Sequence, residues 1–426
     1  MKARYQYRIY PTTEQQTKLA KLFGCCRVVW NDALAHCIEL YKSGEKKLSN
    51  SELQKRFITQ AKKTVEREWL KEVSNIPLQQ SLNDLEQAYH NFFKSCKGKR
   101  KGKKVRPPKF KKRNAKQSAR FRVGGFKLNG DKISLAKIGN LKIVWSRPLP
   151  SQPSSVTLIK DAANRYFLSF VVEVAGSRDV KSRACLQLDS RVNQQPLPDS
   201  PNNVGIDLGI KTFAVLSSGE KIDAPKPLKQ KLKRLRKLNR NLSRKQRGSK
   251  RYERARLRKA KLYARMKDTR KDFLHKLSTR IINENQVVVL EDLNVSGMVK
   301  NRKLSKAISN LGWRQFRTFL EGKAEKYGRD FRVISRWEPT TQKCSCCGFI
   351  GGKLDLSIRE WTCLNCETIH DRDENAAANI LVAGGLSETI NGRGGRRKTS
   401  TKEAAALETS THLEKPVQLS IFDILQ

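Results

Sequence analysis

The N-terminal part of the chain changes from the period of a strand to the period of a helix. Residues 3–10 alternate between apolar and polar side chains, which predicts a β-strand that ends at Pro11. Beyond it, apolar residues recur at helical spacing, and Thr12 with Gln15, or Thr13 with Gln16, can form a capping box. Two further helices are expected at roughly 51–66 and 78–95. The pattern therefore predicts a small helical lobe.

Short alternating runs return between residues 119 and 175, separated by turn-forming residues such as Asn129-Gly130-Asp131. We expect these strands to form a small β-barrel. If the strand at 3–10 joins it, the helical lobe is an insertion into the barrel. The predicted strands are 120–123, 132–135, 141–144, 155–160 and 166–174.

From residue 203 onward, strands of a buried type are mixed with long helices. Strands at 203–208, 213–216 and 221–223 precede a helical hairpin, whose leucines recur at helical spacing on both arms. The apolar run 286–291 predicts a strand with both faces buried, followed by a helix at about 309–327 and a strand at 331–335. The polar, proline-containing stretch before residue 203 indicates a linker, and weak periodicity after residue 385 indicates a disordered tail.

Charge narrows the class of partner. The 426 residues include 88 Lys and Arg against 40 Asp and Glu, a formal net charge of +48. Residues 94–116 contain 13 basic residues and no acid, and residues 229–280 contain 23 basic residues against three acids. Such an imbalance favours nucleic acid as the partner, and it makes the first run a candidate arm that orders on contact with phosphates. A membrane surface fits poorly, because the basic runs are spread over several regions.

The chain has neither an apolar run of the roughly 18–20 residues that a membrane span needs nor the apolar core of a signal peptide. We therefore expect a cytoplasmic protein with reduced cysteines and no membrane partner.

Three acidic residues lie where apolar elements end. Asp207 sits in the apolar segment 204–209, Glu291 ends the run 287–290, and Asp373 begins an alanine-rich helix. Carboxylates in this setting suit two Mg²⁺ (or Mn²⁺) ions about 3.5–4 Å apart on one scissile phosphate, with Asp207 as the shared ligand. Asp371 is a second candidate ligand or a helix cap, and Arg372 a candidate phosphate contact.

A second constellation is a pair of Cys-x-x-Cys motifs with 15 residues between them: Cys344, Cys347, Cys363 and Cys366. This is the spacing of a zinc ribbon, and four thiolates close the coordination shell of one structural Zn²⁺. Cys346 offers a poorer alternative to Cys347. His370 could replace a ligand, although we expect it beside the active site.

These motifs resemble the TnpB family of insertion-sequence proteins, long described as OrfB transposases and similar to type V CRISPR effectors. The resemblance rests on YRIYPT at 7–12, VGIDLGIK at 204–211, VVVLEDLN at 287–294, both Cys-x-x-Cys pairs and HDRDENAAANI at 370–380. It covers most of the chain except the tail. Small departures are Thr340-Thr341 before the first cysteine pair, where Thr-Ser is usual, and Glu367, where Gly is common.

The resemblance implies a multidomain α+β protein with an RNase H-like (RuvC) α/β nuclease domain. The implied parts are a wedge β-barrel at 1–11 and 115–180, a helical recognition lobe with the basic arm at 12–114, a linker at 181–202, the nuclease at 203–343 and 367–384, a zinc-ribbon insert at 344–366 and a tail at 385–426. Asp207, Glu291 and Asp373 carry over as catalytic acids, and the four cysteines as zinc ligands.

The resemblance also implies an RNA-guided DNA endonuclease. Its guide RNA would come from the element's own end, and its target would be double-stranded DNA with a short adjacent motif read by the N-terminal lobes. We expect a monomer in complex with RNA. Two alternatives stay open: a repressor that binds DNA through its guide without cutting, and a transposase that transfers DNA strands with the same three acids.

Overall fold

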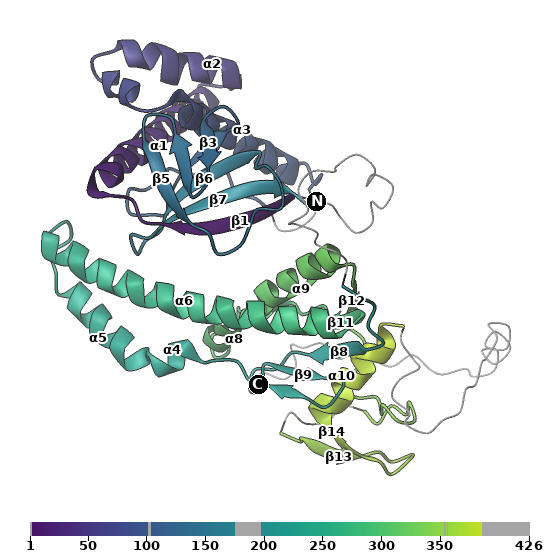
Figure 1. Cartoon of the computed structure of the whole chain (residues 1–426). Coiled ribbons are helices and arrows are strands. Elements are labelled where there is room, and N and C mark those ends of the chain that lie inside the picture. Colours follow the sequence, from purple (N-terminus) through teal and green to yellow (C-terminus); the bar gives the residue numbers. More distant parts are fainter. Residues whose placement is uncertain (1, 101–103, 175–196, 353–354, 356, 386–426) are drawn as a thin grey trace, which may run out of the picture.

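The computed structural model describes residues 2–100, 104–174, 197–352, 355 and 357–385. Two bodies follow one another along the chain (Figure 1). Arg165 of the first forms an ion pair with Asp268 in helix α6 (Lys250–Glu284) of the second. The predicted tail, apart from residue 385, and most of the predicted linker lie outside the described residues. Among the helices within them, none is both long and apolar enough to cross a membrane.

The first body is a seven-stranded antiparallel sheet covered by helices. Its strand order is β2-β6-β7-β1-β5-β4-β3, so the N-terminal strand lies in the middle, as the sequence pattern allowed. Strands β2 and β3 lie at the two ends of this order and do not pair with each other. The sheet is therefore open, whereas we expected a closed barrel. The strands are β1 Lys2–Ile9, β2 Gln117–Arg122, β3 Phe126–Asn129, β4 Lys132–Leu135, β5 Gly139–Val144, β6 Ser155–Lys160 and β7 Tyr166–Glu173.

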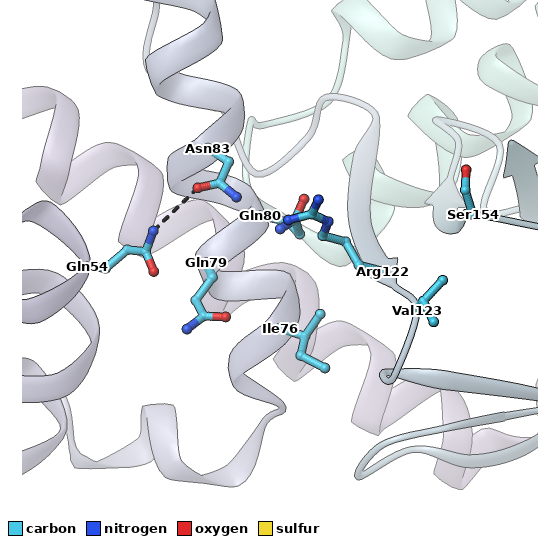
Figure 2. A pocket seen from close by; sticks show the side chains of 8 residues that line it. All are labelled: Gln54, Ile76, Gln79, Gln80, Asn83, Arg122, Val123 and Ser154. Atoms are coloured by element: carbon cyan, nitrogen blue, oxygen red, sulfur yellow. Dashed lines mark hydrogen bonds between the residues drawn. The ribbon is translucent and has the colours of Figure 1, made fainter. Parts of the chain in front are cut away.

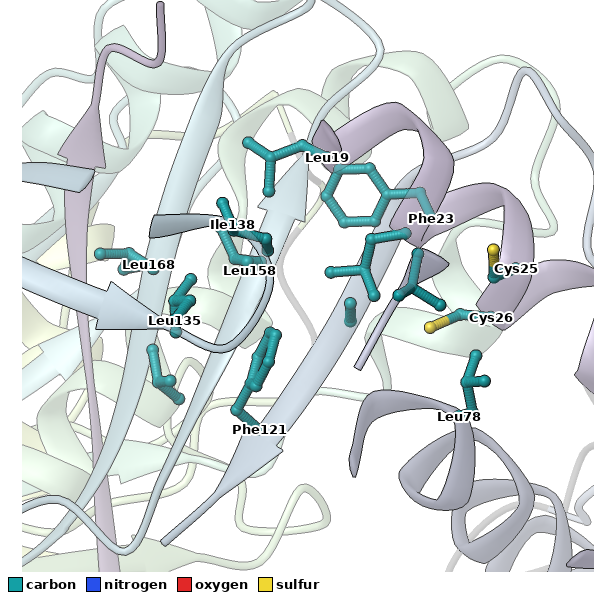
Figure 3. Packing of buried hydrophobic residues seen from close by; sticks show 14 of the residues in the cluster. Leu19, Phe23, Cys25, Cys26, Leu78, Phe121, Leu135, Ile138, Leu158 and Leu168 are labelled. Carbon is teal, nitrogen blue, oxygen red and sulfur yellow. The ribbon is translucent and has the colours of Figure 1, made fainter. Parts of the chain in front are cut away.

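The helices between β1 and β2 cover the inner face of this sheet. Helix α1 (Thr13–Lys42) begins with the predicted capping box, in which Thr12 and Gln15 cap each other. The helix predicted at 51–66 is broken into α2 (Asn50–Gln54), a π-helical turn (Lys55–Gln60) and a 3₁₀ turn (Ala61–Lys63); a second 3₁₀ turn, Glu68–Glu72, precedes α3 (Asn75–Cys96). Figure 3 shows both sides of the core: Leu19, Phe23 and Leu78 from the helices, and Phe121, Leu158 and Leu168 from the sheet.

The second body is built on a five-stranded sheet with the order β10-β9-β8-β11-β12. Strand β11 (Val287–Glu291) lies between two parallel neighbours, β8 (Asn203–Asp207) and β12 (Asp330–Ile334). On the other side of β8, β9 (Ala214–Leu216) pairs antiparallel with β8, and the edge strand β10 (Lys221–Ile222) pairs antiparallel with β9.

Both faces of β11 are covered, which explains its fully apolar sequence. Val288 and Leu290 face a core shared with α6 (Lys250–Glu284) and α9 (Trp313–Tyr327), whereas Val287 and Val289 face α10 (Arg372–Ala383). The hairpin partner of α6 consists of α4 (Pro227–Gln230) and α5 (Leu232–Ser243).

The helix predicted at 309–327 is interrupted. Gly312 adopts a φ of 80°, a left-handed conformation that ends α8 (Ser305–Leu311) and separates it from α9. A short helix, α7 (Val295–Met298), follows β11, and the small hairpin of β13 (Glu360–Thr362) and β14 (Ile369–Asp371) precedes α10.

The basic run at 94–116 is partly fixed in the structure. The indole N–H of Trp30 donates to the carbonyl of Lys109 at 3.1 Å, and Asn31 of α1 exchanges two hydrogen bonds with the backbone of Lys111. The ammonium of Lys111 lies 3.8 Å from the centre of the Trp30 ring. The expectation of an arm that orders only on contact is therefore wrong for this part of it.

Candidate active site and zinc centre

Parallel pairing brings two of the three acids to one edge of the second sheet. Strands β8 and β11 pair with Ile206 opposite Leu290, and the next residues along the two strands are Asp207 and Glu291. The carboxyl ends of parallel strands are where ligands bind in open α/β sheets. The register therefore places the two carboxylates at a position suited to binding.

Helix α10 brings the third acid. It packs directly across β8 at Gly205, where an added Cβ would lie 2.2 Å from the carbonyl oxygen of Ala377 and 2.7 Å from the amide nitrogen of Leu381. Only glycine permits this close approach. Asp373 lies in the first turn of α10, one helical turn before Ala377, and is thereby held near the end of β8.

Electrostatics show that the three carboxylates interact. Burial, together with the charges of Asp373 and Glu291, raises the pKa of Asp207 from its ordinary 3.8 to about 7. Burial also raises the pKa of Glu291, with the charge of Asp292 adding to the effect. Such a cluster of oxygen ligands is short of positive charge, and a bound divalent cation would supply it.

Basic residues surround the acids. Arg359 Nη1 lies 3.2 and 3.3 Å from the two carboxylate oxygens of Asp373. Asp371 caps α10 by accepting hydrogen bonds from the backbone N–H groups of Asp373 and Glu374, and it also pairs with Lys221 at 2.8 Å. Of the two roles proposed for Asp371, the structure shows the helix cap.

The four cysteines form the second centre. Among the described residues, Cys344, Cys347, Cys363 and Cys366 are the one group of metal-ligating side chains whose ligand atoms all lie within 4.8 Å of one another. The sulfur pairs 344–366 and 347–363 are 3.7 and 3.6 Å apart. A tetrahedral zinc ion with Zn–S bonds of about 2.3 Å separates its sulfurs by roughly 3.8 Å. The cluster therefore fits a structural zinc, and the exposed Cys346 is outside it.

His370 belongs to this centre. Its Nε2 lies 3.0 Å from the sulfur of Cys344, and its ring packs against Trp361 with centroids 4.9 Å apart. We expected this histidine beside the catalytic acids. Pairing of β13 with β14 turns it toward the cysteines instead, opposite Trp361.

Two buried asparagines of α10, to which the sequence analysis gave no role, join the two centres. Asn375 accepts a hydrogen bond from the backbone N–H of Ser345 and donates to the carbonyl of Lys343, both at 2.8 Å. Asn379 donates to the carbonyls of Lys343 at 2.6 Å and Thr340 at 2.9 Å. Their spacing of four residues puts them on one face of the helix, which is the signal that could have identified them.

A cavity of about 570 Å³ opens in the first body, between α2, α3 and the loop after β2 (Figure 2). Its walls carry an unusual number of side-chain amides. These belong to Gln54, Gln79, Gln80 and Asn83, with Arg122 and Ser154 beside them.

Comparisons with known proteins identify the family and the coarse fold. Residues 170–302 match a family described as "Probable transposase" of the OrfB type, and residues 313–380 match the Cas12f1-like TNB domain. Residues 1–46 match a family described as a helix-turn-helix domain, although here they form β1 and one long helix, α1. A solved Cas12f1–sgRNA–target DNA complex has a similar multidomain α+β fold, with a TM-score of 0.50 at 13% identity over 89% of this chain and 98% of that one.

Two relatives share most of the chain. A Streptomyces pristinaespiralis protein named "Putative RNA-guided DNA endonuclease" is 41% identical over 388 residues, which is 90% of each chain. The InsQ protein of Escherichia coli K12, with the same printed description, is 28% identical over 89% of this chain and 92% of its own. A sequence match of this extent, together with the transposase and TNB matches, shows that the chain belongs to the TnpB family of insertion-sequence proteins.

Proposed function

We propose that this protein is an RNA-guided DNA endonuclease that hydrolyses phosphodiester bonds of target DNA with Asp207, Glu291 and Asp373. The observation that carries the proposal is the half-buried carboxylate of Asp207 at the end of β8, whose pKa is raised to about 7 by burial and by the two other acids. A purely structural role does not explain why carboxylates that raise one another's pKa are gathered here, whereas metal-dependent phosphoryl chemistry uses such a group.

The three acids supply the oxygen ligands that Mg²⁺ or Mn²⁺ takes. Asp207 would be the ligand common to two such ions, with Glu291 and Asp373 each completing one shell. Such ions, when bound, generate a nucleophile from water at neutral pH and stabilise the charge on the leaving oxygen. The chain's own contribution is to hold Asp207 and Glu291 at the ends of β8 and β11 and Asp373 at the start of α10, with Arg359 and Arg372 close by for the phosphate.

The remaining parts follow from the same proposal. Residues 203–343 and 367–384 would be the RuvC-like nuclease, and residues 344–366 a zinc-ribbon insert that contacts nucleic acid. The sheet and helices at 1–180 would be the wedge and recognition lobes. The basic hairpin of α5 and α6 would carry the RNA–DNA heteroduplex, because such a protein binds that duplex through its phosphates.

The amide-lined cavity of Figure 2 supports a further part of the proposal, that the N-terminal lobes read a short motif beside the target. Asn and Gln amides form paired hydrogen bonds with adenine edges, and arginine does so with guanine. A cavity with Gln79, Gln80, Asn83 and Arg122 in its wall offers both kinds of donor.

The proposal is tested by expressing the protein with its flanking DNA and sequencing any RNA that copurifies. The purified complex is then assayed on DNA that matches the RNA. Asp207→Ala should abolish cleavage and leave RNA and DNA binding intact, whereas Asp223→Ala, an exposed acid after β10, should cut normally. Cleavage by Asp207→Ala would refute the assignment of the acids. Guided binding without cleavage by the unaltered protein would favour a repressor, and strand transfer of element ends would favour a transposase.

A further inference from the structure

A second cavity opens directly beside the catalytic acids. It has a volume of about 370 Å³, and its wall includes Glu291 and Leu208, the residue that follows Asp207. The rest of the wall comes from the loop after β11, from the first turns of α9 and from Arg336, which follows β12. A DNA strand whose scissile phosphate lies at the acids would continue past or into this cavity.

Three arginines line the cavity: Arg314, Arg317 and Arg336. Two of them are fixed by Asp292, whose carboxylate accepts hydrogen bonds from Arg317 Nη1 at 2.6 Å and from Arg336 Nη2. Arg317 is held from its other side by Glu321, with Nε 2.9 Å from the carboxylate.

Arg314 is the available cation of the three. It is exposed, and it has no acidic partner within the part of the chain that the structure describes. The cavity therefore has two arginines that are paired with carboxylates and one, Arg314, that can bind an anion. Guanidinium groups bind phosphate with defined geometry.

Trp337 adds an aromatic surface at the same place. It follows the cavity-lining Arg336 directly, in the segment between β12 and the first cysteine pair, and its side chain is 83% exposed. An indole exposed to this extent leaves its flat faces open to a stacking partner. One residue along the chain from the cavity wall, it offers a stacking platform for an unpaired base.

We propose that this cavity and Trp337 form a subsite for one unpaired nucleotide of the DNA strand, next to the scissile phosphate. Arg314 binds the phosphate of that nucleotide, and its base stacks on Trp337. The volume lies in the range of single-ligand pockets, roughly 300–1,000 Å³, so it holds one nucleotide and excludes a duplex. The inference rests on the proposed nuclease function, since it assigns the strand that the acids would cut.

Photochemical cross-linking tests the subsite without cleavage. Full-length Asp207→Asn protein, purified with whatever RNA accompanies it, is mixed with a short single-stranded oligothymidine that carries one 5-iodo-2′-deoxyuridine. After irradiation, mass spectrometry locates the cross-link, which is expected on Trp337. Trp337→Phe should retain the cross-link and Trp337→Ala should lose it. Tyr41, which is 84% exposed at the end of α1, is the comparison aromatic and should not be labelled.

A salt titration separates the two contacts. Arg314→Gln should raise the DNA concentration for half-maximal cross-linking several-fold, and it should reduce the slope of log affinity against log salt by about 0.7, the value for one phosphate on a single strand. Trp337→Phe should keep the unaltered slope. Lys326→Gln, at the other end of α9, should change neither the cross-link nor the slope.

The outcomes also separate this inference from the nuclease proposal. A protein that cuts guided DNA but is labelled elsewhere, or equally well as Arg314→Gln, would overturn the subsite alone. A protein that is labelled at Trp337 but never cuts would retain the subsite and refute the nuclease.

Discussion

Replacing Asp207 with asparagine should stabilise the metal-free protein, and the gain should grow with pH. Asp207→Asn keeps the shape of the side chain but cannot carry its charge. In the folded protein the pKa of Asp207 is raised from 3.8 to about 7, mainly by burial and then by Asp373 and Glu291. A raised pKa in an acid means that the folded state binds the proton more tightly than the unfolded state, so ionisation opposes folding.

The magnitude follows from the two pKa values. Below pH 3.8 the carboxyl of Asp207 is protonated in the folded and the unfolded state, so it does not change the free energy of unfolding. Between pH 3.8 and pH 7, the loss of folding free energy caused by ionised Asp207 grows by about 1.4 kcal/mol for each pH unit. Above pH 7 this loss levels off at about 4 kcal/mol. Asp207→Asn should thus gain about 1–2 kcal/mol at pH 5 and about 4 kcal/mol at pH 8, which is a rise of several degrees in the Tm.

The assay is thermal unfolding at pH 5 and pH 8, with and without Mg²⁺. Mg²⁺ should raise the Tm of the unaltered protein at pH 8 and leave Asp207→Asn unchanged, because the variant lacks the charge that the ion would neutralise. The control is Asp292→Asn. Hydrogen bonds from Arg317 and Arg336 lower the pKa of Asp292, so removing its charge should lower the Tm at pH 8 and have a smaller effect as the solution becomes acidic. Equal Tm values for Asp207→Asn and the unaltered protein at both pH values would refute the reasoning.

Three further changes have defined outcomes. Gly205→Ala drives a methyl group into the backbone of α10 and should cost at least about 1–3 kcal/mol of stability and most of the cleavage, while RNA copurification persists; normal cleavage would contradict the close approach of α10. Cys347→Ser should reduce the zinc content measured by mass spectrometry and Cys346→Ser should not, and the reverse result would exchange the two ligands. Glu367→Gly should raise the Tm of the zinc-loaded protein, because Glu367 has a left-handed φ of 55°, a conformation that costs a residue with a side chain about 1 kcal/mol and glycine almost nothing. A lower Tm would show that contacts of the Glu367 side chain outweigh this backbone strain.

Local features of the structure could be predicted well from the sequence. The strands at 132–135 and 155–160 have the predicted bounds, and the capping box at Thr12 is present, because these features depend on neighbouring residues. The missed strand Phe126–Asn129 has only four residues, too few for alternation to be distinctive. The break at Gly312 was also missed, because a single glycine inside an apolar helical period does not by itself end a helix.

The sequence by itself determined the period of each element, the cysteine spacing that fits zinc, the positive charge, and the three acids at the ends of apolar runs. Only the tertiary structure decided which of these residues meet. The parallel register of β8 with β11 puts Asp207 and Glu291 at neighbouring strand ends, the contact of α10 with Gly205 brings the start of α10 near β8, and the β13–β14 pairing turns His370 to the cysteines. The physical reason is that secondary-structure period is set by residues a few positions apart, whereas these contacts depend on packing between segments far apart in the chain.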